Sequence, residues 1–312
     1  MVKERSAEEI NEYSEMANSV MKELFGKKSG KLQYKPAGQT NFVFEANLPD
    51  GDFIIRISTA KDKIESFKKE QWVLERVKKE GIPVAEIIEV GNEVVKMPYM
   101  VQKKIKGQDA LYHPDKKKIL QQMGEYNSII NKIHTNDFGK TFDWSDDDSS
   151  KNKTWEDFLK NEIEIESRLA ILEKNKMVSA ESLKKLSEYL QRINELNLQP
   201  VLNHGDMRRK NVLVNDKAEI VAIIDWEESC SSIAPAWDLS IALHDLAVDD
   251  KQFYLEGYGI TSKEYREIFE TIKAFNLINY APIIKDLVKR KEKHHLEFYK
   301  LRLSGCFDLY SL

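Results

Sequence analysis

The sequence predicts an α+β protein whose first part is a five-stranded antiparallel sheet with one inserted helix and whose second part is mainly helical. Before residue 107, short strand-like apolar segments alternate with Gly and Pro turns. After it, apolar residues recur at helical spacing. The chain has 312 residues, of which 41% are hydrophobic, enough to bury a sizeable core.

In the first part, apolar positions at helical spacing predict a leading helix that ends before Gly26. Three short segments separated by Pro and Gly turns then predict an antiparallel meander. A charged helix and two more strands follow. The expected elements are, in chain order, a helix (11–25), three strands (31–35, 42–47 and 52–57), a helix (61–79) and two strands (84–90 and 99–105).

In the second part, long segments with a 3.6-residue period dominate. One helical face collects Ile119, Met123, Tyr126, Ile130 and Ile133. Further helices are expected at 155–173, at 180–194 and from 265 onward, and two short apolar runs predict strands at 212–214 and 220–224.

The charge balance excludes several classes of protein. With 48 Lys and Arg against 52 Asp and Glu, the net charge of -4 gives no general attraction for nucleic acid or an anionic membrane. The charged start lacks the apolar region of a secretory signal, and no apolar run approaches the roughly 20 residues that span a bilayer. Cys230 and Cys306 form no CxxC pair. We therefore expect a cytoplasmic protein, monomeric or dimeric, that binds neither nucleic acid nor membrane.

One stretch concentrates groups that bind metals or transfer protons. Asp206 and Asn211 lie at the two ends of a polar loop that begins with His-Gly-Asp, and Asp225 follows the next apolar strand. Oxygen ligands of this kind suit Mg²⁺, which keeps water and phosphate oxygens in its shell. Alone, each residue is compatible with a turn, a cap or a strand end; their order and spacing favour a functional site.

This stretch resembles the catalytic and metal-binding segments of the aminoglycoside phosphotransferase and choline kinase-like family, relatives of the protein kinases. The family pattern is His-Gly-Asp, an Asn five residues after that Asp, and an Asp closing a later strand. The resemblance implies a two-lobed protein kinase-like fold and a Mg-nucleotide-dependent phosphotransferase. It further implies that Asp206 is the catalytic base, that Asn211 and Asp225 hold Mg²⁺, and that His204 and Asp238 support the catalytic loop.

Two charged residues on otherwise apolar elements give a second indication of a kinase-like site. Glu70 shares a helical face with Phe67, Leu74 and Val77, and Arg56 lies inside an apolar strand. Because an unpaired buried charge is costly, we expect these two side chains to form an ion pair. The pair resembles the kinase arrangement in which a basic strand residue binds nucleotide phosphates, with Arg here in place of Lys.

The resemblance also assigns the remaining nucleotide contacts. The turn that contains Gly38, Thr40 and Asn41 resembles the family's phosphate-covering turn, although Gly38 is also compatible with an ordinary hairpin. Residues 102–107, with Gln102, Lys103 and Ile105, match the hinge whose backbone would bind adenine. The implied organisation is a nucleotide-binding lobe (1–101), the hinge (102–107) and a helical acceptor lobe (108–312). Either ATP or GTP fits it.

The acceptor is less well determined by sequence. Acidic residues between the hinge and the catalytic loop, with Glu227 and Glu228 after Asp225, favour a cationic acceptor such as an aminoglycoside or aminocyclitol, and hence a role in antibiotic resistance. Choline, an amino sugar and an amino acid hydroxyl are alternatives. A catalytically silent nucleotide-binding module is a further alternative. The other acidic residues are Asp143, Asp146, Asp147, Asp148, Glu156, Asp157, Glu162, Glu164 and Glu166.

Overall fold

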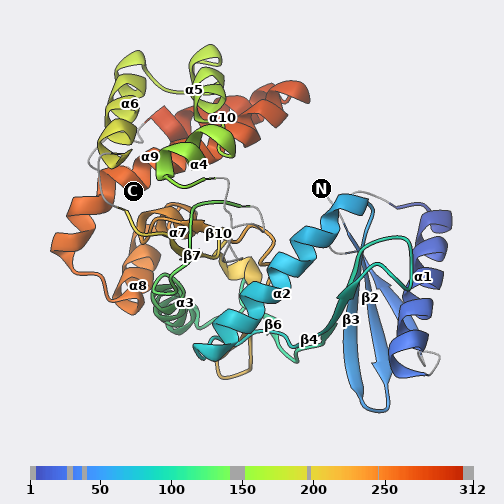
Figure 1. Ribbon diagram of the computed structural model, residues 1–312. Helices are drawn as coiled ribbons and strands as arrows, with labels where there is room; N and C mark the ends of the chain where they lie inside the picture. Colours follow the sequence, from blue (N-terminus) through green and yellow to red (C-terminus); the bar gives the residue numbers. More distant parts are fainter. Residues whose placement is uncertain are drawn as a thin grey trace. The chain divides into compact units, whose positions relative to one another are not determined.

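The computed structural model describes residues 5–26, 31–36, 41–140, 152–194, 198–244 and 246–304 (Figure 1). The chain divides into two compact units. The first combines Met1–Gln108 with Val212–Glu227, and the second combines Asp109–Asn211 with Glu228–Leu312. None of the described helices combines the length and the apolar character needed to span a bilayer.

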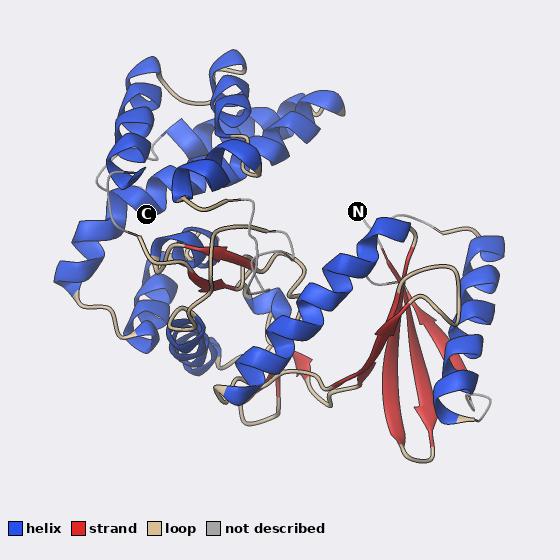
Figure 2. Cartoon of the chain, in the orientation of Figure 1, coloured by secondary structure: helices blue, strands red, loops and turns tan. Residues whose placement is uncertain are grey.

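The first unit contains a five-stranded antiparallel sheet in the order β1-β2-β3-β5-β4 (Figure 2). A small second sheet, in the order β6-β8-β9, follows it. The elements of this unit are α1 (Ala7–Phe25), β1 (Lys31–Lys35), β2 (Asn41–Leu48), β3 (Gly51–Ser58), the 3-10 turn η1 (Lys61–Lys63), α2 (Ile64–Lys79), β4 (Ile87–Gly91), β5 (Tyr99–Lys103), β6 (Gln108–Asp109), β8 (Val212–Val214) and β9 (Ile220–Ile223).

Alternation along the central strand β3 gives the five-stranded sheet its two faces. Phe53, Ile55 and Ile57 point to one face and form a buried cluster with Val20 and Met21 of α1. The intervening Arg56 points to the other face, where it meets α2. The two helices therefore cover opposite faces of the sheet, and a charged side chain faces one of them.

The second unit is mainly helical, with one two-stranded sheet formed by β7 and β10. Its elements are α3 (Lys116–Ile130), α4 (Trp155–Asn161), α5 (Ile165–Lys174), α6 (Ala180–Asn194), β7 (Val201–Asn203), the 3-10 turn η3 (Arg209–Asn211), β10 (Cys230–Ser232), α7 (Ala236–Ala242), α8 (Val248–Tyr258), α9 (Ser262–Lys289) and α10 (Lys293–Ser304).

An aromatic cluster forms part of the core of this second unit. Trp155 of α4, Trp237 of α7 and Phe275 of α9 are all buried. Their ring centroids lie 5.3 to 5.9 Å apart in tilted and edge-on arrangements. Each ring buries a large apolar area, so the cluster holds three helices that are distant in sequence around one point.

The structure confirms the expected fold class and the five strands and two helices of the first part. The single helix expected at 155–173 is wrong, because two helices occupy this segment and Glu164 between them has a left-handed backbone with φ 53°. The short strands β6, β7 and β10 were not expected, since two or three residues carry too little pattern to detect. The boundaries expected for a hinge and two functional lobes stay a prediction.

Helices α3 and α8 approach closely at two glycines. A Cβ atom at Gly124 would lie 2.1 Å from the carbonyl oxygen of Tyr254, and one at Gly257 would lie 1.9 Å from that of Gln121. Distances this short require backbone movement. The glycines are therefore needed for the contact rather than for flexibility.

We predict that Gly124→Ala lowers the free energy of unfolding by about 2 kcal/mol, because the added methyl group must separate two packed helices. Urea unfolding followed by circular dichroism measures this change. The exposed neighbour Glu125 offers a control, since Glu125→Ala should stay within about 0.5 kcal/mol of wild type. Equal effects of the two substitutions would contradict the close helix contact.

Candidate active site

The loop with the His-Gly-Asp sequence connects β7 to the 3-10 turn η3. Gly205 has a φ of 77°, which favours glycine, and a Cβ atom there would lie 2.1 Å from the carbonyl oxygen of Glu228. The Nδ1 atom of His204, a fully buried residue, accepts a hydrogen bond from the backbone N–H of Asp206 at 3.2 Å. The loop thus turns sharply and presents Asp206 at a fixed position.

The Asp206 carboxylate is largely buried and is held by three side chains. Its Oδ1 atom accepts a hydrogen bond from Nε of Arg208. Its Oδ2 atom accepts from Nδ2 of Asn211 at 2.8 Å and pairs with Nζ of Lys210 at 2.9 Å. Burial raises the pKa of Asp206, but the bonds from Arg208 and Lys210 outweigh it and lower the pKa below its usual value. The carboxylate therefore stays ionised and able to accept a hydrogen bond at neutral pH.

Asp238, at the start of α7, holds this loop through hydrogen bonds to its backbone. Its carboxylate is fully buried and accepts from the backbone N–H of His204 at 3.0 Å and of Gly205 at 2.9 Å. A third bond at 3.1 Å comes from Nδ2 of Asn131, whose own Oδ1 accepts from the Tyr258 hydroxyl at 3.0 Å. These are the contacts that a loop-supporting residue needs. Burial raises the pKa of Asp238 to about 6, although the three donated bonds limit the rise.

Asn211 and Asp225 carry the oxygens expected to bind Mg²⁺. Nδ2 of Asn211 donates to the carbonyl oxygen and to Oδ2 of Asp206, both at 2.8 Å, so these two bonds do not use Oδ1 of the amide. Asp225 follows β9 with a left-handed φ of 66°. An amide oxygen and a carboxylate are hard donors of the kind Mg²⁺ takes alongside phosphate oxygens, so the two side chains fit this ion chemically.

In the first unit, the ion pair expected between Arg56 and Glu70 is present. Nη1 of Arg56 lies 2.6 Å from Oε1 of Glu70, and the side chains are 14% and 3% exposed. Burial lowers the pKa of Arg56, but Glu70 and then Glu227 and Asp225 raise it more, so the guanidinium pKa is raised. Asp225 therefore lies within electrostatic range of Arg56.

The other residues expected to bind nucleotide stay predictions. Gly38 and Thr40 lie outside the described residues. Asn41 begins β2 and is buried, and its Oδ1 has no hydrogen-bond partner among the described residues. In the expected hinge, Gln102 and Lys103 end β5, and the N–H of Lys103 donates to the carbonyl oxygen of Glu86.

Two backbone donors in the expected hinge are already used within the first unit. The N–H groups of Lys103 and Lys104 point in opposite directions, toward Glu86 and Asp52. The contact expected between the backbone of Ile105 and adenine stays a prediction.

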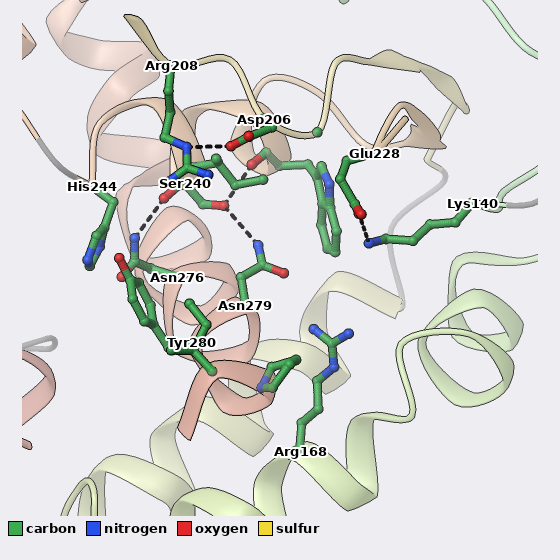
Figure 3. Close-up of a pocket in the computed structure, with 15 residues that line it drawn as sticks. Lys140, Arg168, Asp206, Arg208, Glu228, Ser240, His244, Asn276, Asn279 and Tyr280 are labelled. Atoms are coloured by element: carbon green, nitrogen blue, oxygen red, sulfur yellow. Dashed lines mark hydrogen bonds and ion pairs between the residues drawn. The ribbon is translucent and has the colours of Figure 1, made fainter. Parts of the chain in front are cut away.

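A cavity of about 400 Å³ opens beside Asp206 within the second unit (Figure 3). Glu228 lines it and pairs with Lys140 at 3.0 Å. Glu227 is not among the lining residues; its carbonyl oxygen accepts from Nζ of Lys69 at 2.8 Å in the first unit. Sequence reasoning did not identify the rest of the lining, which includes Lys140, Arg168, Arg208, Asn276, Asn279 and Tyr280.

A comparison with protein families matches residues 32–270 to the model of the phosphotransferase enzyme family. The matched segment includes the His-Gly-Asp loop, Asn211, Asp225 and Asp238. The chain belongs to this family. It is therefore a small-molecule kinase, and its two units carry the kinase-like fold that this phosphotransferase family adopts.

Solved structures share this fold. A thermostable mutant of the aminoglycoside phosphotransferase APH(4)-Ia in its apo form has a TM-score of 0.66 and 16% identity, covering 93% of this chain and 97% of that one. The GDP and kanamycin complex of APH(2")-IIia has a TM-score of 0.65 and 16% identity, covering 94% and 97%.

A ternary complex of a thermostable mutant of APH(4)-Ia with AMP-PNP and hygromycin B gives a TM-score of 0.63 and 16% identity, covering 93% and 97%. At these identities the likeness shows the fold alone. Curated protein sequences give no significant match.

We predict that Glu70→Ala lowers the free energy of unfolding of this phosphotransferase by about 3 kcal/mol, because it leaves the buried Arg56 charge without its carboxylate. Chemical denaturation measures the loss. Glu65→Ala on the same helix is a matched control: Glu65 pairs with Lys68, but the two side chains are 57% and 50% exposed, so the cost should be below about 1 kcal/mol.

We also predict a pH dependence that originates at Asp238. Its folded pKa of about 6 is raised above the roughly 3.9 of an exposed aspartate, so the folded state holds the proton more tightly. The contribution of Asp238 to stability is therefore fully present below about pH 4 and is lost as the pH rises through about 6. The wild-type minus Asp238→Asn difference in unfolding free energy, measured from pH 4 to 7, should fall; a constant difference would contradict this assignment.

Proposed function

We propose that the protein transfers the γ-phosphoryl group of ATP or GTP to a hydroxyl group of a small molecule bound in the cavity beside Asp206. The observation that carries this proposal is the Asp206 carboxylate, which lines that cavity and is kept ionised by Arg208 and Lys210. An ionised carboxylate can accept the hydrogen bond of the attacking hydroxyl and orient its oxygen toward phosphorus.

In the proposed reaction, the acceptor oxygen forms a bond to the γ-phosphorus while the bond from phosphorus to the β–γ bridging oxygen breaks. The nucleoside diphosphate leaves, and Asp206 takes the proton of the hydroxyl and then releases it to solvent. Asp238 and His204 hold the loop so that the carboxylate needs no rearrangement during transfer.

The nucleotide would be bound by residues of the first unit. Arg56, held by Glu70, would contact phosphate through its planar donors. The turn with Gly38, Thr40 and Asn41 would cover the phosphates, and the hinge (102–107) would bind the base through its backbone. This division supports a nucleotide-binding lobe (1–101) and an acceptor lobe (108–312).

Asn211 and Asp225 would hold Mg²⁺, which when bound would neutralise charge on the transferring phosphate. The register of the β8–β9 hairpin supports this pairing. Val212 pairs with Ile223, so Asn211, directly before β8, and Asp225, two residues after β9, extend from the same end of the hairpin.

An aminoglycoside acceptor, with a role in antibiotic resistance, is a second and finer candidate. It is favoured by the solved complexes of related fold with kanamycin and with hygromycin B. The acidic residues at 143 and 146–148 that also favoured it lie outside the described residues. Of the remaining acidic residues expected near the acceptor, only Glu228 lines the described cavity.

Nucleotide consumption with a panel of small alcohols tests the proposal, and Asp206→Ala tests the role of the carboxylate. We predict that this substitution lowers kcat by about 1,000-fold or more while nucleotide binding, measured by calorimetry, changes little. Asp286→Ala, at an exposed position of α9, should leave both unchanged.

Full activity of Asp206→Ala would refute the assignment of the base. Magnesium-dependent stabilisation by nucleotide without turnover on any alcohol would instead favour a silent nucleotide-binding module.

A further inference from the structure

The charges that line the cavity beside Asp206 do not cancel. Among the described lining residues, Arg208 bonds to Asp206 and Lys140 pairs with Glu228. Arg168 also lines the cavity, and no carboxylate in the described part of the chain forms an ion pair with it. With each of these carboxylates already bonded to another basic residue, one half-buried guanidinium charge is left over.

The position of this guanidinium is fixed by a proline in a helix. Pro282 lies inside α9 and has no N–H, so it cannot donate to the carbonyl oxygen of Ile278 four residues earlier. Nη1 of Arg168 takes that place and donates to Ile278 at 3.2 Å. The free carbonyl therefore orients a side chain from α5 toward the cavity.

Most donors of Arg168 are not used by the bond to Ile278. A guanidinium carries five N–H groups, and the bond to Ile278 uses one of them. Figure 3 shows the Arg168 side chain extending into the space that Asn279 faces from the opposite side. Burial lowers the pKa of Arg168, and Glu164 and Glu228 offset this only in part, as expected for a guanidinium whose charge is incompletely balanced.

A planar fork of donors with one unbalanced charge matches a carboxylate, which accepts two parallel hydrogen bonds from arginine. A phosphate dianion would need a second free cation. An ammonium group would be repelled, so a polycation would have to place its charges elsewhere. Neighbouring amides of Asn276 and Asn279 donate to Ser240, which turns their oxygens toward other partners such as ligand hydroxyls.

We propose that the acceptor is a small hydroxycarboxylate: Asp206 receives its hydroxyl group and Arg168 binds its carboxylate. This inference rests on the proposed phosphotransfer to a small alcohol and adds the chemical class of the substrate. The cavity volume of about 400 Å³ suits a molecule the size of a sugar acid or a hydroxy amino acid.

The test compares matched probes on the full-length protein. Glycerate, gluconate, glucuronate and homoserine are each assayed beside a neutral counterpart, namely glycerol, sorbitol, glucose and 1,3-propanediol. Kanamycin and glucosamine represent cationic acceptors. Thermal stabilisation measures binding, and nucleotide consumption measures turnover. We expect at least one hydroxycarboxylate to stabilise the wild type more than its neutral counterpart and to be turned over with the highest kcat/KM.

Substitution of Arg168 identifies the group responsible. Arg168→Gln should raise the KM of that hydroxycarboxylate by about 30-fold, as expected for loss of a charge-assisted bidentate contact, while the KM of the neutral counterpart changes less than about threefold. Pro282→Ala returns a helical donor to Ile278 and should raise the same KM in the same direction. Arg290→Gln, at the exposed end of α9, should change neither value.

Three results would overturn the inference. The first is the absence of stabilisation by any of the hydroxycarboxylates. The second is a higher kcat/KM for kanamycin, glucosamine or a neutral alcohol, in which case phosphotransfer stands and the acceptor class is wrong. The third is an Arg168→Gln variant that unfolds at lower temperature but keeps the wild-type ratio of the two KM values, which would make Arg168 a structural tether between α5 and α9. Stabilisation lost in Arg168→Gln without turnover on any probe would support the binding site while refuting the enzyme proposal.

Discussion

The catalytic loop of the second unit depends on one buried carboxylate. Asp238 is fully buried, and it accepts hydrogen bonds from the backbone N–H groups of two consecutive residues of a turn, His204 and Gly205. Satisfying both donors with one ionised group fixes the left-handed turn at Gly205, and the turn fixes Asp206. Tyr258 and Asn131 extend this network away from the loop, so helices α3, α7 and α8 all contribute to the geometry of a single side chain.

The acidity of the two aspartates at the site depends on their burial as well as on their charged neighbours. Desolvation alone would raise the pKa of Asp206, but Arg208 and Lys210 lower it below its usual value. Asp238 has only uncharged hydrogen-bond donors, and its pKa is raised. Asp206 lies on the loop and Asp238 contacts it, and the two differ in acidity because Asp206 has cationic neighbours whereas Asp238 has amide donors. The more acidic one faces the cavity, where an ionised group is useful.

Sequence reasoning predicted the sheet, its two helices and the Arg56–Glu70 pair, because each follows from a period or from the cost of an isolated buried charge. It also singled out Asp206, Asn211 and Asp225, which form a compact motif. It did not find Arg168 or Lys140, since these residues come from distant segments and stand in ordinary helical or loop surroundings. Pro282 was the available signal: a proline within a helical pattern frees a carbonyl group, but the sequence alone does not say which donor will take it.

At Pro282, the residue that orients a charged group differs from the residue that carries the charge. Pro282 has no charge and no hydrogen-bond donor, yet the free carbonyl it leaves at Ile278 sets the direction of a cation on another helix. Selectivity for a ligand could therefore drift among relatives through changes in helix backbone bonding, with every charged side chain of the cavity left in place. Chains with the same ligand selectivity are therefore better identified by a proline within one helix together with an arginine that faces it than by the arginine alone.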